Sequence, residues 1–292
     1  MQRLGLVLGL AILSCGAVGP ALAETGAVPP SDLAAIEIPQ TVTALSAALR
    51  ISEVMVALRD EGMANAAELA ADLPRGGADP LWAQALLRIY DPAHMETEFN
   101  QALAESLGQE ADTLSAATAF FASGIGQRAL SLELAARKAL MDDAVEAAAE
   151  AAYADLARTD PQRQAQIERF VAVNDLVESN VMGALNANLA FLQGLGESGG
   201  PEFALPEADM LAQVWAAEPE VRAEMQGWVY PFLTLAYQPL SDDELQSYID
   251  FSETPAGQRV NAAMFQAYDA VFDQISRDLG RSFGIALQGN DI

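Results

Sequence analysis

Apolar residues recur at helical spacing along most of the chain. In the last long segment they lie three or four residues apart, or at the sum of those spacings, and so form one broad stripe. Alternating strand patterns and Asn-Gly hairpins are missing from the sequence. The pattern predicts an all-α protein with about five helices in each half. The residues of the clearest stripe are Val260, Met264, Val271, Ile275 and Leu279.

The expected helix starts are marked by capping residues. An Asp or Thr side chain can accept a hydrogen bond from the first turn, and a following Pro suits the first helical position. Ser241 with Glu244 three residues later has the spacing of a capping box. The cap-Pro pairs are Asp79-Pro80, Asp91-Pro92, Asp160-Pro161 and Thr254-Pro255.

One nine-residue motif occurs twice, 131 positions apart and without a gap. Residues 120–128 align with residues 251–259, and Ser123 aligns with Thr254 at an expected helix N-cap. The two copies share Phe, Gly, Gln and Arg at four positions. These shared residues are Phe120 and Phe251, Gly126 and Gly257, Gln127 and Gln258, and Arg128 and Arg259.

Further matches extend the repeat towards the N-terminus at shorter offsets. Leu49 aligns with Leu176 at an offset of 127, and Ala83-Gln84 aligns with Ala212-Gln213 at 129. Drifting offsets are typical of a duplicated domain whose loops have changed length. We therefore predict two helical repeats, residues 35–158 and 160–287, packed as a pseudo-symmetric pair that shares one interface.

The repeated motif predicts a packed corner between two helices. The Phe at positions 120 and 251 should be buried there, and the Gly at 126 and 257 should allow close approach of the neighbouring helix. Thr254-Pro255 should start the helix of the second copy. Arg128 and Arg259 lie near a positive helix N-terminus, so we expect each to reach a carboxylate or carbonyl of an adjoining helix.

The second copy resembles a known bacterial family. Its signature residues are Glu244-Leu245, Phe251 and Thr254-Pro255-Ala256-Gly257, within the longer run that starts at Leu240. This pattern is similar to that of the domain-of-unknown-function family 2059 over residues 205–285. The first copy departs from it, with Thr113 before Leu114 and Gly124 in place of the Pro. The resemblance implies a small, helical, exported protein, and it implies no activity.

The first 23 residues have the pattern of a secretory signal peptide. Arg3 precedes an apolar run, and the small-residue segment ends at Ala23 before Glu24. We expect cleavage after Ala23 and a periplasmic or secreted protein, with residues 24–34 as a flexible leader. The alternative is a lipoprotein acylated at Cys15, because Ile12-Leu13-Ser14 precedes it as a weak lipobox.

The charge of the chain limits its partners. Removal of Arg3 with the signal leaves 14 basic and 41 acidic residues, a net charge of −27. Such a charge disfavours nucleic acids and anionic membrane surfaces and favours solubility or a cationic partner. Cys15 is the only cysteine, so thiol catalysis, zinc–thiolate sites and iron–sulfur ligation are not expected in the mature chain. The mature chain carries no expected transmembrane segment.

No residue pattern assigns catalysis. His94 is the only histidine, and we expect it to be exposed in a first helical turn. Nucleotide-binding, hydrolase and metal-site motifs are missing, so we assign no catalytic, cofactor-binding or metal-binding residue. The remaining pocket candidate is an aromatic cluster around Pro231, where core packing is the competing interpretation. Its members are Trp228, Tyr230, Phe232 and Tyr237.

The sequence favours a non-enzymatic binding or scaffolding protein of the cell envelope, whose partner is an unknown protein or small molecule. One alternative is an envelope hydrolase that uses two carboxylates. Another is a small-molecule carrier that uses a groove between the repeats. A pocket with two facing acids would favour the hydrolase, a dry tunnel the carrier, and a broad exposed apolar groove the partner-binding protein.

Overall fold

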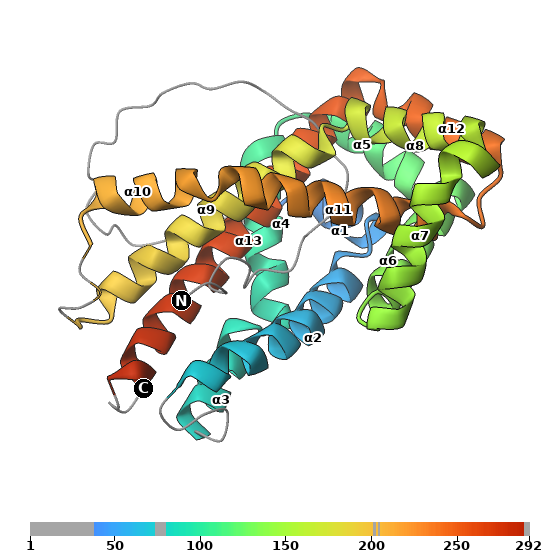
Figure 1. Cartoon of the computed structure of the whole chain (residues 1–292). Helices are drawn as coiled ribbons and strands as arrows, with labels where there is room; N and C mark the ends of the chain where they lie inside the picture. The colour runs from blue at the N-terminus through green and yellow to red at the C-terminus, as the bar shows by residue number, and fades with distance from the viewer. Residues whose placement is uncertain (1–37, 74–79, 201–202, 204, 289–292) are drawn as a thin grey trace.

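The computed structural model describes residues 38–73, 80–200, 203 and 205–288. Within these ranges the chain is helical and contains no strand. Figure 1 shows the helices in order of colour along the chain. They are α1 (Gln40–Ala48), α2 (Ile51–Leu69), η1 (Ala70–Asp72), α3 (Pro80–Ile89), α4 (Pro92–Leu107), α5 (Ala111–Phe121), α6 (Gly124–Ala139), α7 (Asp143–Thr159), α8 (Pro161–Val173), α9 (Leu176–Glu197), α10 (Glu207–Ala216), α11 (Glu218–Tyr237), α12 (Asp242–Ser252) and α13 (Pro255–Leu287).

The predicted capping residues lie at the starts of the helices for which they were predicted. Ser241 accepts from the Glu244 backbone N–H, and the Glu244 side chain accepts from the Ser241 N–H, which completes the capping box. Asp79 lies outside the described residues. Each of the other nominated caps accepts a hydrogen bond from a backbone N–H in its first turn. These caps are Asp91, Ser123, Asp160 and Thr254.

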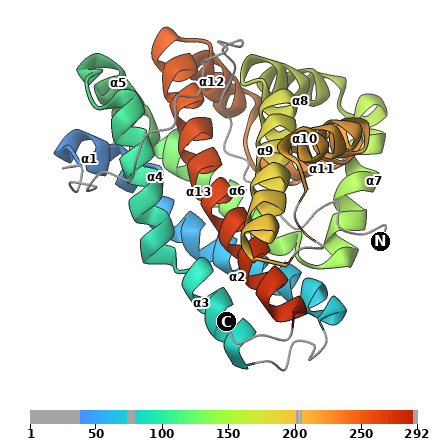
Figure 2. The ribbon, with the colours of Figure 1, turned by 90° about the vertical axis from the view of Figure 1, so that its left-hand side faces the viewer.

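The longest helix, α13, forms the centre of the molecule. It packs along α9 on one side and against α3, α4 and α5 on the other. Figure 2 shows α13 in the middle of the fold, with α4 and α3 on one side of it and α9 on the other. The α9 contact is close because Gly194 and Gly280 leave room for the backbone of the facing helix.

One hydrophobic core runs through the whole described fold. It contains side chains on both sides of Asp160, including Leu45 of α1, Phe99 of α4, Phe170 of α8 and Tyr268 of α13. A smaller cluster joins α9, α10 and α11 around Val181. The two predicted repeats therefore do not have separate cores.

The number of helices differs from the prediction. The described residues contain α1 to α7 before Asp160 and α8 to α13 after it, where about five were expected on each side. Short helices such as α1 and α10 account for the difference, because their apolar stripes are too brief to stand out in the sequence.

The prediction that Phe120 and Phe251 are buried is wrong. Both rings are half-buried, and they stack on each other with centroids 3.9 Å apart and an interplanar angle of 2°. The fully buried positions of the two corners belong to the next residues, Phe121 and Ser252. Each Phe therefore contacts its counterpart in the other half, across the contact between α5 and α12.

The helix α7 buries fewer residues than the adjacent helices α6 and α8. Its sequence is rich in Ala, and Ala149 is its only buried residue. It begins where α6 ends: Asp142 accepts from the Ala144 N–H and so starts a new helix after the turn at Leu140 and Met141. By contrast, α13 continues for 33 residues without a break.

No single helix among the described residues has the length and apolarity of a membrane span. The pair α1 and α2, which meet at a bend of 59°, reaches that length and composition only when the two are taken together. The expected signal peptide (1–23) and leader (24–34) lie outside the described residues.

Candidate functional site

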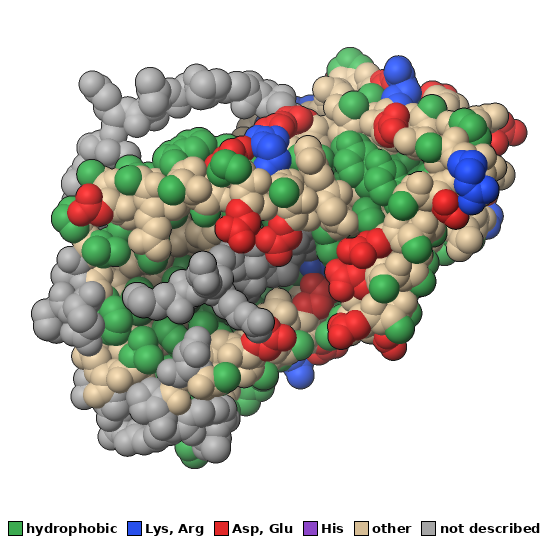
Figure 3. Space-filling model, viewed as in Figure 1, with side chains coloured by type: hydrophobic (Ala, Val, Ile, Leu, Met, Phe, Trp, Pro, Cys, Tyr) green, Lys and Arg blue, Asp and Glu red, His purple; other side chains and the backbone are tan. Residues whose placement is uncertain are grey.

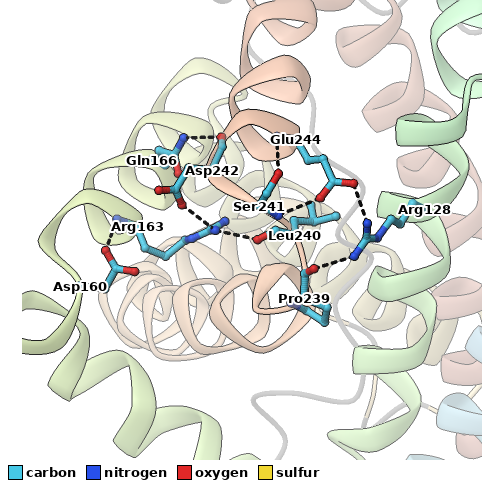
Figure 4. A network of polar contacts seen from close by, with 9 residues as sticks. All are labelled: Arg128, Asp160, Arg163, Gln166, Pro239, Leu240, Ser241, Asp242 and Glu244. Atoms are coloured by element: carbon cyan, nitrogen blue, oxygen red, sulfur yellow. Dashed lines mark hydrogen bonds and ion pairs between the residues drawn. The ribbon is translucent and has the colours of Figure 1, made fainter.

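A polar network fixes the start of α12 against α6. Arg128 Nη1 donates to Glu244 Oε1 over 2.6 Å, and Arg128 Nη2 donates to the Pro239 carbonyl oxygen over 2.7 Å. Figure 4 shows the Arg128 side chain reaching from α6 towards this corner. Glu244 is itself held by the capping box, so it presents a fixed carboxylate to the guanidinium.

The same network extends to α8 on the other side of the corner (Figure 4). Arg163 Nη2 donates to the Leu240 carbonyl oxygen over 2.7 Å and to Asp242 Oδ1 over 2.8 Å. Gln166 Nε2 donates to the Asp242 carbonyl oxygen over 2.9 Å. These contacts fix α8, and therefore the end of α7 that leads into it.

Arg259 makes a corresponding contact in the opposite direction. Its Nε donates to Glu110 Oε1 over 2.8 Å, and its Nη2 donates to the Ser106 carbonyl oxygen over 2.7 Å. Glu110 precedes α5 as Ser241 precedes α12. The side chain of Arg259 is about one third exposed, so solvent screens this ion pair, and Arg259 is not among the lining residues of the cavities described below.

The two motif glycines sit where helices approach closely. A Cβ at Gly126 would overlap the backbone of Phe120 and Phe121, and a Cβ at Gly257 would overlap the backbone of Phe251. Each glycine lies three residues into its helix and faces the preceding helix. The eight residues that the two copies of the motif share therefore lie at the helix corners, and none of them lines a described cavity.

An apolar groove of about 740 Å³ lies between α7 and the end of α11. Its floor on α7 consists of small side chains at helical spacing, among them Ala144, Ala148 and Ala152. Leu235 of α11 faces them. The ends of the groove are polar, with Asp142 at one end and Asp155, Asp160 and Arg163 at the other. This volume is in the range of small-molecule pockets.

An acidic hollow of about 320 Å³ lies between α2 and α11. Acidic side chains gather around a depression in the middle of the face shown in Figure 3. Glu61 and Glu68 of α2 and Asp143 of α7 line the hollow, and Trp228 of α11 borders it. Arg137 at the end of α6 is the one cation in its lining. The remaining lining residues are Ala64, Asn65, Leu140 and Met141.

Arg137 is already paired. Its Nε donates to Glu61 Oε1 over 2.5 Å, and its Nη2 donates to Glu61 Oε2 over 2.6 Å. Both side chains are largely buried, with exposed fractions of 6% and 14%. A bidentate buried pair neutralises itself. The exposed carboxylates of Glu68 and Asp143 therefore give the hollow its negative charge.

A carboxyl group of α6 is buried against α11. The Tyr237 hydroxyl of α11 donates to Glu133 Oε1 of α6 over 2.7 Å. Burial raises the pKa of Glu133 to about 7, and the hydrogen bond from Tyr237 opposes that rise. In the described part of the chain, neither Glu133 Oε2 nor the Tyr268 hydroxyl has a hydrogen-bond partner. No sequence pattern predicts this buried carboxyl group, because Tyr237 lies 104 residues away from Glu133.

The four aromatic residues around Pro231 do not line one common cavity. Trp228 borders the acidic hollow, and its ring stacks on Phe232 at 4.6 Å. Tyr230 stacks on Tyr153 of α7, and Tyr237 is buried beside Glu133. The cluster therefore joins α11 to its neighbours, and only the Trp228 ring borders a candidate site.

His94 lies in the first turn of α4, as the sequence predicts, and its side chain is 57% exposed. It pairs with Glu98 at 3.4 Å beside a cavity of about 400 Å³ between α3, α4 and α13. Burial raises the pKa of Glu98. Across the described ranges, no group of three or more His, Cys, Asp or Glu side chains has the geometry to hold a metal ion.

Comparison with known proteins gives one match. Neither a curated protein nor a solved structure matches the chain. The match falls on residues 93–155, which cover most of α4, all of α5 and α6, and α7 as far as Asp155. The sequence resemblance had placed the family segment at residues 205–285 instead. Over that segment the chain matches the bacterial family described as "Uncharacterized protein conserved in bacteria (DUF2059)", the family expected from its sequence.

Proposed function

We propose that this chain is an exported, non-enzymatic binding protein of the cell envelope, built from one helical unit present twice. The signal-like residues 1–23 support export to the periplasm, with cleavage after Ala23. The match to an uncharacterised bacterial family is compatible with this location and assigns no activity.

The order of the elements supports the duplication. Helices α1 to α6 pair with α8 to α13 in sequence, and the turn after the first helix of each series contains a residue with positive φ. These residues are Arg50 (φ 59°) and Asp175 (φ 48°). A left-handed non-glycine residue is uncommon, so its occurrence at both corners is informative. The two lie 125 positions apart, so we align α2 with α9 at an offset of 125 in the proposed repeat, in place of the 127 inferred from Leu49 and Leu176.

Reciprocal contacts support a two-fold arrangement of the copies. Arg128 reaches the N-terminus of α12, while Arg259 reaches that of α5. Phe120 and Phe251 stack on each other, as equivalent residues do at a two-fold axis. Gln127 and Gln258 each donate to a carbonyl at the end of the first helix of their own series, Ala48 and Val173.

One observation carries the binding function: the second copy fills a position that the first copy leaves open. The C-terminal half of α13 lies along α9, whereas the first copy breaks after α6 and its next helix, α7, packs on α11 and α8. The acidic hollow beside α2 occupies the position left uncovered. An open helix face with a charged border is typical of a protein-binding surface.

The small-molecule carrier is a second candidate. The groove between α7 and α11 has an apolar floor and a volume of about 740 Å³, which is large enough for a drug-sized ligand. It lies between the first and the second series of helices, where a carrier that uses a groove between the repeats would hold its cargo, but it is an open groove and not the dry tunnel that would favour this function over partner binding.

Photocrosslinking in the native host separates the two candidates. A photoreactive side chain would replace Ala64 in the hollow, Ala148 in the groove, or Ala147, an exposed α7 residue that lines neither. We expect a discrete protein adduct from position 64 and none from 147. A small-mass adduct from position 148 alone would favour the carrier. Absence of both adducts would contradict both functions.

A further inference from the structure

We propose that the acidic hollow binds a basic helix of a partner protein, in the way that α9 binds the C-terminal half of α13. This inference rests on the proposed duplication and binding function, and it specifies the chemistry of the partner. Its basis is the register in which α6 lies on α2 and α13 lies on α9.

The two helix pairs run in the same direction and in the same register. In the second copy, Asn261 of α13 faces Asn174, and Gly194 of α9 lies against Arg277. In the first copy, Arg50 contacts Ser131 of α6, and Arg137 pairs with Glu61 of α2. A continuation of α6 past Ala139 would therefore pass directly over the residues of α2 that line the hollow.

The second copy shows which charges this position takes. Arg277 Nη2 donates to Gln193 Oε1 over 2.6 Å, and Arg277 Nη1 donates to Glu197 Oε1 over 2.8 Å. Arg281 also donates to Glu197. Two arginines one turn apart on α13 thus face polar and acidic side chains of α9. The position of Gln193 corresponds, 125 residues earlier, to Glu68 in the hollow.

The chain's own α7 has the opposite charges. At the offset of 131 found for the repeated motif, Arg277 and Arg281 correspond to Glu146 and Glu150. If α7 continued α6 along α2, Glu146 would approach Glu68, and like charges would oppose the contact. The break at Asp142 directs α7 to α11 and α8 and leaves the α2 face open.

The occupant is therefore a helix with two Arg or Lys residues one turn apart. Its basic residues would meet Glu68 and Asp143, both exposed and both in the lining of the hollow. The half-buried Trp228 ring, which stacks on Phe232, offers an aromatic face at the border. The surrounding excess of acidic residues would steer a basic segment towards this face.

A synthetic peptide with the sequence of residues 270–287, in which asparagine replaces Asp273 and Asp278, is the direct probe, because it is basic and keeps both arginines in the register of α13. We expect the full-length mature protein to bind it in isothermal titration calorimetry, with an affinity that falls as salt rises. A peptide with Glu at the positions of Arg277 and Arg281 should bind at least about tenfold more weakly.

Charge reversal on the protein locates the site. Glu68→Lys should weaken binding of the arginine peptide by about tenfold, while Glu105→Lys, an exposed α4 position away from the hollow, should leave it unchanged. Equal affinity in Glu68→Lys and the parent protein, or binding that ignores the arginines, would overturn the inference. A protein crosslinked at position 64 together with no peptide binding would retain the binding function and reject the basic helix.

Discussion

Replacing Gly194 with alanine should destabilise the protein by on the order of 3 kcal/mol. A Cβ at this position would overlap the carbonyl oxygen and carbon of Arg277 on the facing helix. Backbone atoms cannot move aside as a flexible side chain can, so α9 and α13 would have to separate along their shared face. Urea unfolding followed by circular dichroism would measure the change.

The matched control is Gly227→Ala in α11. A Cβ there would have no atom within 4 Å, so the helix should gain up to about 1 kcal/mol from the better helix former. If Gly194→Ala were as stable as the parent, α9 and α13 would not be in close contact. The α9–α13 pair could then not serve as the model for a helix bound in the hollow.

Glu133→Gln should reduce the dependence of the protein's unfolding free energy on pH. Burial raises the pKa of Glu133 to about 7, above the ordinary value of 4.5 that applies to the unfolded chain. Between these values the folded protein retains a proton that the unfolded chain releases, so stability falls as pH rises from 4.5 to 7. The full effect is about 3 kcal/mol, because one pKa unit corresponds to ~1.4 kcal/mol.

Unfolding free energies of the two proteins at pH 5 and pH 8 would test this. The Gln variant should lose less stability over that range, because its amide does not titrate. Burial, with the nearby Asp273 carboxylate as a further cause, also raises the pKa of Asp269 to about 7. Asp269→Asn should therefore reduce the pH dependence of the unfolding free energy further. Parallel pH profiles for the parent and Glu133→Gln would show that Glu133 is ionised in the folded protein at pH 5.

The local features of the fold could be predicted from the sequence because they depend on near neighbours. Ser241 and Glu244 form their capping box within one turn, and Asp160 caps α8 in the same way. The break after α6 was harder to predict, since Asp142 acts as a cap there while Asp273, its counterpart at 131 residues, lies inside α13. Whether an Asp at this position caps a new helix or lies inside a continuous one depends on what the helix packs against.

The candidate site depends on contacts that the sequence does not reveal. Glu133 is buried because Tyr237, 104 residues away, reaches it from α11. The composition of the aromatic cluster indicates a pocket, yet its rings contact different neighbours. The offset of 131 found for the repeated motif aligns Glu146 and Glu150 with Arg277 and Arg281 in the sequence itself. This reversal of charge can be interpreted only from the packing, because α7 packs on α11 and α8 while α13 packs on α9.

The central claim is that the hollow beside α2 is the open counterpart of the α9–α13 contact. A crystal structure of the protein with this peptide of residues 270–287 tests it most directly. After superposition of α9 on α2, the bound peptide should coincide with the C-terminal half of α13, with its first arginine beside Glu68. A peptide bound elsewhere, or one that crosses α2 without contact to Glu68, would contradict the account.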